Sequence, residues 1–235
     1  MTPNGFPRSR LLLTLSIAVP LAVLGDALWV RADPGSPPWQ GFDDWWNGLV
    51  GSPVGSPLWH AAELFNHLGG ELGLVLGAVG IVLLLLVRRW RSAVYVCAAL
   101  AATKLVTDAG KHLAERPRPG DITVDTGSWA FPSGHSSRIA AIVVVIAVLF
   151  VPARHWKRWW PFAIALTCAM MLARNWQHAH WLTDTVAGAA TGAAVAVFMW
   201  WALAPLLDRE RALREGAQLE TADAGAQGIG SERLS

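Results

Sequence analysis

The sequence predicts an all-α membrane protein, a polytopic bundle of six transmembrane helices with both termini on the cytoplasmic side. Three observations support this fold class. Of the 235 residues, 53% are hydrophobic and only 15% are charged, which is too apolar for an ordinary soluble domain. The apolar residues form long runs rather than amphipathic stripes, so the bilayer is the expected solvent. Basic residues are also distributed unevenly between the loops, which indicates the orientation.

The N-terminal part predicts one span followed by an interfacial loop. Residues 11–30 follow a short basic leader and are long enough to cross a hydrocarbon core of about 30 Å. We interpret them as a retained span, because the run is long for a cleaved signal peptide. Residues 31–57 are predicted to be a loop, in which Trp39, Trp45 and Trp46 suit a membrane surface.

The second and third predicted spans both carry polar residues. Residues 58–87 form the second span, and its first half contains polar groups such as Glu63. That half either lines the headgroup side of the bundle near the site or forms an exposed interfacial turn. In the third span, 92–112, Lys104 and Asp108 are spaced to share one helical face. Because charges at membrane depth are costly, we expect them to pair inside the bundle.

The C-terminal half predicts three more spans and a tail. The spans are residues 136–151, 159–173 and 181–207, and small residues in the last one allow close helix contacts. We therefore expect one membrane-embedded domain, 1–208. Residues 209–235 are polar and low in aromatics, which predicts a disordered cytoplasmic tail.

Positive charge predicts the orientation of the bundle. With six spans, eleven of the nineteen Lys and Arg residues share the side of the termini, as short cytoplasmic loops do. These residues are Arg8, Arg10, Arg88, Arg89, Arg91, Arg154, Lys157, Arg158, Arg209, Arg211 and Arg214. The opposite, extracytoplasmic side keeps Arg31, Lys111, Arg116, Arg118 and Arg174.

Three short motifs lie at the ends of the spans on that opposite side. K-x6-R-P begins at Lys111, P-S-G-H begins at Pro132, and R-x5-H-x3-D runs from Arg174 to Asp184. In this order they resemble the three signatures of the type 2 phosphatidic acid phosphatase / vanadium haloperoxidase superfamily, and in particular its membrane lipid phosphatase branch. One position departs from the pattern, because Ala173 stands where the family often has Ser.

The residue types in these motifs suit a phosphate group. Arg118 and Arg174 can each bind two phosphoryl oxygens with a planar fork, and Lys111 adds a point charge. Ser133 and Gly134 precede a predicted helix start, where a hydroxyl and free backbone amides suit an anion. These five residues are the predicted phosphate-binding set.

The resemblance also implies catalytic roles. His180 would be the nucleophile that forms a phosphohistidine, and Asp184, one helical turn away, would fix its tautomer. His135 would protonate the leaving alkoxide and then activate water. His178, His180 and Asp184 could instead be read as metal ligands. We expect no metal and no cofactor, because the cations of the motifs already supply positive charge. Arg116 is expected to support the site from behind.

These features predict a multi-pass enzyme of the plasma membrane that acts on a lipid phosphate within the bilayer. The resemblance implies phosphatidic acid, phosphatidylglycerol phosphate or undecaprenyl diphosphate as substrates. An extracytoplasmic site suits recycling of a polyprenyl carrier, which favours the diphosphate. Nothing in the net charge of +2 indicates nucleic acid. Two alternatives remain: a vanadate-dependent haloperoxidase, and a non-hydrolytic protein that binds or flips lipid phosphates.

Overall fold

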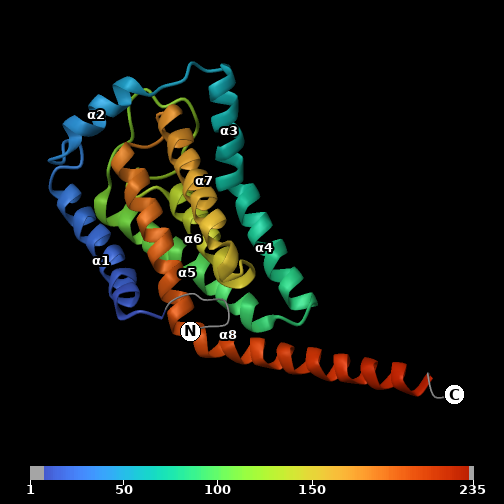
Figure 1. Ribbon diagram of the computed structural model, residues 1–235. Coiled ribbons are helices and arrows are strands. Elements are labelled where there is room, and N and C mark those ends of the chain that lie inside the picture. The colour runs from blue at the N-terminus through green and yellow to red at the C-terminus, as the bar shows by residue number, and fades with distance from the viewer. Residues whose placement is uncertain (1–7, 233–235) are drawn as a thin grey trace.

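A computed structural model describes residues 8–232, with side chains described for residues 8–216. Within this range the regular structure is helical, and the helices form a bundle from which the end of the last helix projects (Figure 1). The elements are α1 (Arg10–Ala32), α2 (Gln40–Leu49), α3 (Pro57–Gly69), α4 (Glu71–Leu86), α5 (Trp90–Ala114), α6 (Gly134–Phe150), a short 3-10 helix (Ala153–His155), α7 (Trp156–Trp176) and α8 (Leu182–Glu232).

The apolar helices identify a multi-pass membrane protein. Three helices, α1, α5 and the Leu182–Gly216 part of α8, are long and apolar enough to cross a bilayer. A fourth span results if α3 and α4, which bend by 40° at their junction, are counted as one. The count of six spans and the orientation stay predictions, because α6 is a shorter apolar helix of 17 residues.

The surface of α4 shows why a bilayer is needed. Most of its large apolar side chains point away from the bundle, and water would not stabilise such a continuous patch. The exposed residues include Leu72, Leu74, Val75, Leu76, Val79, Val82, Leu83, Leu85 and Leu86.

Several details differ from the sequence prediction. The predicted loop 31–57 contains α2, so Trp45 and Trp46 lie on a helix. Lys104 and Asp108 do pair, with 2.5 Å between Nζ and Oδ2, but their side chains are 65% and 43% exposed rather than buried inside the bundle. The expected burial was wrong because this face of α5 lines a groove.

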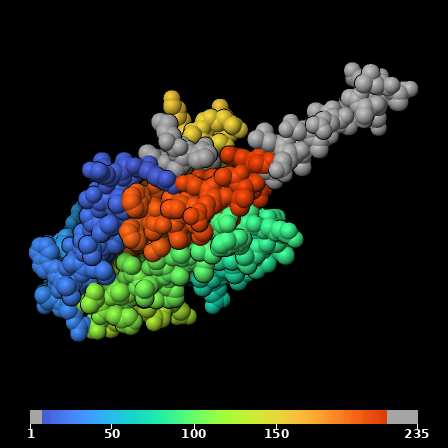
Figure 2. Space-filling model, turned by 90° about the horizontal axis from the view of Figure 1, so that it is seen from below, coloured from blue at the N-terminus to red at the C-terminus, as the bar shows by residue number. Residues whose placement is uncertain are grey.

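The first part of α8 packs against α1, α5 and α6, and Figure 2 shows it between α1 and the α4–α5 side. Its contact with α6 is close because two glycines face that helix. A Cβ on Gly188 would overlap the backbone of Ser133, and one on Gly192 would overlap the backbone of Ser137. Small residues at these positions therefore place the start of α6, which carries the second motif, directly against α8.

Glu210, in the middle part of α8, fixes the start of α5. The Glu210 carboxylate accepts hydrogen bonds from the backbone N–H of Arg91 and Ser92, at 3.0 and 3.1 Å, and from Nε of Arg89 at 3.3 Å. A carboxylate at a helix N-terminus satisfies otherwise unpaired donors. The backbone of α8 continues beyond the expected span end at 207 to Glu232, and the packed region includes Glu210. The disorder and cytoplasmic location of residues 209–235 stay predictions.

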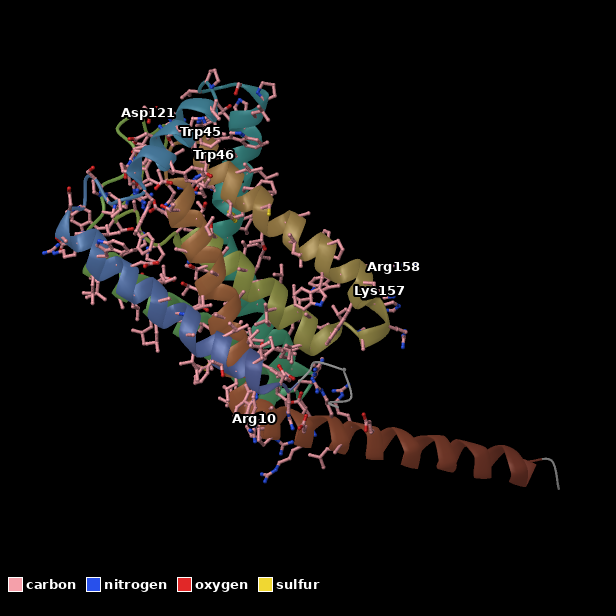
Figure 3. All side chains as sticks on the ribbon, turned by 60° about the vertical axis from the view of Figure 1, so that its left-hand side comes forward. Arg10, Trp45, Trp46, Asp121, Lys157 and Arg158 are labelled. Atoms are coloured by element: carbon pink, nitrogen blue, oxygen red, sulfur yellow. The ribbon has the colours of Figure 1, made fainter. Side chains whose placement is uncertain are left out.

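The orientation is testable with an impermeant thiol reagent. Figure 3 shows Arg10, Lys157 and Arg158 toward one end of the bundle and Asp121 toward the other. In a background without Cys97 and Cys168, Asp121→Cys should react in intact cells, whereas Lys157→Cys should react only after lysis. The reverse labelling pattern would contradict the orientation predicted from the basic residues.

Candidate active site

The three motifs converge on one cavity of about 270 Å³. It lies where the ends of α3, α5, α6 and α7 meet two loops, and it brings together residues that are far apart in the sequence. Its wall includes Asn66, Asp108, Lys111, Arg118, Ser128, Gly134, His135, Arg138, Arg174 and His180.

Lys111 and Arg118 are held by neutral oxygen acceptors. Lys111 donates from Nζ to the Ser128 hydroxyl at 3.2 Å and to the Trp129 carbonyl. Arg118 donates from Nε to the Ser128 carbonyl at 2.8 Å and from Nη1 to the Ala179 carbonyl. Both positive charges are thus positioned without being neutralised by a carboxylate.

Arg174 is 1% exposed and is held in the same manner. Its Nη1 donates to the side-chain oxygens of Asn66, at 2.5 Å, and Gln177, at 2.6 Å. Gln177 in turn donates to the Glu63 carboxylate at 2.8 Å. Asn66 and Glu63 belong to α3, so the polar half of the predicted second span contacts the site, the first of the two alternatives given above.

His180 is 2% exposed and presents an unprotonated nitrogen to the cations. Its Nε2 lies 3.2 Å from Nη1 of Arg118, which can only donate, so the ring proton is assigned to Nδ1. Nδ1 faces Asp184 Oδ2 at 3.6 Å. Burial, and then the charges of Arg118 and Lys111, hold the pKa of His180 well below its usual value. His180 is therefore a neutral imidazole at neutral pH.

The residues around His180 hold its backbone and the carboxylate that lies beside its ring. Asp184 Oδ2 accepts from the Trp181 backbone N–H at 2.9 Å, so the carboxylate caps the start of α8 beside the imidazole. Asn175 donates from Nδ2 to the His180 carbonyl at 2.9 Å. The Trp46 indole donates to Asn175 Oδ1 at 3.2 Å, which ties α2 to this loop.

A fully buried arginine behind the site holds Asp184. Arg116 pairs with Asp184 Oδ1 through Nη1 and with Asp43 Oδ2 through Nη2, both at 2.7 Å. It also donates to Gln40 Oε1 at 2.6 Å and to the Thr183 hydroxyl at 2.9 Å. Sequence reasoning placed Arg116 near the site but missed Asp43 and Gln40. The only signal for them was a carboxylate and an amide within a stretch predicted to be a loop.

The second motif supplies the remaining groups. His135 donates from Nε2 to the Asn66 carbonyl at 3.2 Å, because a carbonyl only accepts. Gly134, one of the predicted phosphate-binding residues, lines the cavity. Ser133 does not, because it is fully buried and its hydroxyl caps the start of α6. The backbone N–H of Ser133 donates to the Asp184 carbonyl at 2.9 Å, so this residue positions the motif.

Two non-glycine residues beside the site adopt left-handed backbone conformations. Glu115 has φ 48° and precedes Arg116, and His178 has φ 49° and precedes His180 by two positions. Such strain often occurs at functional sites. His178 contacts Asp121 Oδ2 and the Val50 carbonyl, both at 2.5 Å, rather than the His180 ring. Within the described residues, no three His, Cys, Asp or Glu side chains gather as metal ligands.

Fold and site together define a helical membrane protein with a cavity lined by Lys111, Arg118 and Arg174. Residues 92–207 match the model of the PAP2 superfamily, and the chain belongs to this superfamily. A solved structure with the same fold is described as "the first transmembrane PAP2 type phosphatidylglycerolphosphate phosphatase from Bacillus subtilis". The match has a TM-score of 0.61 and 21% identity, and it covers 77% of this chain and 93% of that one. No curated protein sequence matches the chain. Membership of this superfamily indicates a phosphatase.

The buried pairing predicts a large effect of Asp43→Asn on stability. Losing one of two carboxylates leaves the Arg116 charge partly uncompensated, and we expect unfolding to become easier by about 3 kcal/mol. Asp44→Asn is the matched control, because Asp44 is exposed and an asparagine there can still accept the hydrogen bond from Gln40 Nε2, so stability should change by less than about 0.5 kcal/mol. Thermal unfolding in detergent measures both. Equal stability of the two variants would show that Asp43 is not needed to hold Arg116.

Proposed function

We propose that this chain is a metal-independent membrane phosphatase that hydrolyses lipid phosphates or diphosphates through a phosphohistidine. The observation that carries the proposal is the convergence of Lys111, Arg118 and Arg174 on one cavity with His180. Phosphoryl transfer requires mainly positioning and stabilisation of charge on the equatorial oxygens. Three fixed cations around a neutral imidazole supply both.

In the first step, His180 Nε2 would attack phosphorus in line with the leaving oxygen. A P–N bond forms as the P–O bond breaks, and the electron pair of the broken bond goes to the leaving oxygen. His135, in its protonated form, would give that oxygen a proton. The modified ring carries a positive charge while it keeps its Nδ1 proton, and Asp184 Oδ2, 3.6 Å from Nδ1, would stabilise that charge.

In the second step, water would attack the phosphorus of the phosphohistidine. His135, now neutral, accepts a proton from that water as the P–N bond breaks, and its charge is restored for the next cycle. His180 leaves as a neutral imidazole with its Nδ1 proton in place. Arg118 and Lys111 would hold the phosphoryl oxygens through both steps, because they line the same cavity wall.

A groove beside the cavity favours a lipid substrate. A second cavity of about 300 Å³ lies between α4, α5 and α6 and is lined mainly by apolar residues and glycines, among them Gly73, Gly77 and Leu100. It shares Asp108, Gly134 and Arg138 with the catalytic cavity. A lipid could place its chain in this groove while its phosphate enters the cavity, without leaving the bilayer.

The candidate substrates are phosphatidic acid, phosphatidylglycerol phosphate and undecaprenyl diphosphate. The solved structure with the same fold is described as a phosphatidylglycerolphosphate phosphatase, which supports the second candidate. We also propose that the site faces the extracytoplasmic side of the plasma membrane, on the basis of the charge distribution above.

Phosphate release from a panel of these lipids in detergent tests the proposal, with His180→Ala as the inactive control. We expect turnover to survive EDTA and to be inhibited by vanadate, which binds phosphoryl-transfer sites. Loss of turnover in EDTA that a divalent metal restores would revive the metal-ligand reading of His178 and His180. Halide oxidation with vanadate and no phosphate release would instead indicate the haloperoxidase alternative.

The activities of the His180→Ala and His135→Ala variants should depend differently on the leaving group of the substrate. His180→Ala should abolish turnover of every substrate, because no phosphoenzyme can form. His135→Ala should slow phosphoenzyme formation from an alkyl phosphate by about a hundred- to ten-thousand-fold, but affect an aryl phosphate little, since a phenolate leaves without a proton. Rapid-quench measurement of labelled phosphoenzyme checks this. Equal slowing for both substrates would remove His135 from the acid role.

A further inference from the structure

Arg138 is a charged residue on the α6 helix that the motifs do not include. It follows His135 by three positions, so it lies about one turn further along the helix. This turn is further from Lys111, Arg118 and Arg174, which we call the cation cage. It lines both the catalytic cavity and the apolar groove, at the place where they join. An ionisable side chain at membrane depth is costly and normally has a function there.

The hydrogen bonds of Arg138 leave part of its guanidinium unused. Nη1 donates to the carbonyl of Gly70 at 2.8 Å and to that of Gly69, at the break between α3 and α4. Among the described residues, Nε and Nη2 have no hydrogen-bond partner, and neither belongs to the fully buried unpaired atoms. Arg138 therefore caps the end of α3 and still offers donors to a ligand.

The charges near Arg138 also favour an anion. Asp108 lies on the same shared wall, but Lys104 pairs with it at 2.5 Å. The charges of these two residues offset each other, so Arg138 supplies the net positive charge of the junction. A substrate that runs from the cage to the groove must pass this point.

We propose that Arg138 binds a second phosphate, one that stays on the leaving group of the substrate. This inference rests on the proposed function. His135 lines the catalytic cavity, and Arg138 lines both that cavity and the groove, so the atoms beyond the leaving oxygen would lie beside Arg138. The preferred substrates are then lipids that keep a second phosphate on the leaving group, either directly bridged to the one released, as in a polyprenyl diphosphate, or separated from it by a glycerol, as in a phosphatidylglycerol phosphate. Phosphatidic acid has no such group.

The second phosphate would also assist the chemistry for a diphosphate. When His180 Nε2 bonds to the terminal phosphorus, the bridging P–O bond breaks and its electron pair passes to the bridging oxygen. That oxygen becomes a terminal oxygen of the lipid monophosphate, whose negative charge increases. Donors from Arg138 would stabilise this charge as it develops.

The test compares farnesyl diphosphate with farnesyl monophosphate, which differ only in the second phosphate. Arg138→Gln keeps an amide donor for the Gly69 and Gly70 carbonyls but removes the charge. We expect its kcat/KM to fall about 10- to 100-fold for the diphosphate and by less than about threefold for the monophosphate. Arg88→Gln is the matched control, because Arg88 is exposed and lies in the α4–α5 connection, at the opposite end of α5 from Lys111. It should change neither value.

Further measurements separate the possible outcomes. Phosphatidylglycerol phosphate and phosphatidic acid form a second substrate pair, which shows whether a more distant phosphate is also bound. Asp108→Asn leaves the Lys104 charge without its partner beside Arg138 and should raise the preference for the diphosphate, a test that does not depend on Arg138→Gln folding. Equal losses on both farnesyl substrates, or an unchanged preference in Asp108→Asn, would overturn the role of Arg138. A wild-type protein that releases no phosphate from any of the four lipids would instead refute the proposed function.

Discussion

The site depends on one buried ion pair network, that of Arg116 with Asp43 and Asp184. A guanidinium with no exposed surface is costly to desolvate, and two carboxylates at 2.7 Å offset that cost. The three residues come from the α5–α6 loop, α2 and α8, so their pairing fixes these three segments relative to one another. Because Asp184 Oδ2 lies 3.6 Å from the Nδ1 of His180, the network also sets where this carboxylate lies relative to the proposed nucleophile. The ion pairs that stabilise the buried Arg116 thus also determine the geometry of the site.

The cations in and behind the site fall into two groups according to the atoms that accept their hydrogen bonds. Arg116 pairs with carboxylates, and its charge is neutralised. Lys111, Arg118 and Arg174 are instead held by carbonyl, hydroxyl and amide oxygens. A neutral acceptor orients a cation but leaves its charge uncompensated. The cavity therefore keeps its positive potential, and an incoming phosphate meets donors that are already in position, with little reorganisation.

Much of the fold could be predicted from the sequence, since each apolar run becomes a helix where the backbone must satisfy its own hydrogen bonds. The helix α2 was missed because its ten residues include glycines and polar side chains, and it is fixed by tertiary contacts such as Asp43 with Arg116. In the site, the motifs identified residues that meet in one cavity. The structure alone could show that Ser133 turns away from the cavity, because its capping role depends on the backbone at the start of α6.

The break between α3 and α4 lies against the ring of His135. A Cβ on Gly69 would lie 2.6 Å from Cδ2 of that ring, so only glycine allows α3 to pass so close. At the break the Asn66 carbonyl still accepts from the Gly70 N–H, at 2.8 Å, and the Gly70 carbonyl accepts from the Leu74 N–H, at 3.3 Å, but side chains supply further donors. His135 donates to the Asn66 carbonyl, and Arg138 donates to those of Gly69 and Gly70. The broken helix is thus stabilised by side chains of the second motif and its continuation. The break thus lies beside the cavity, where His135 and Arg138, near the start of α6, donate to the end of α3.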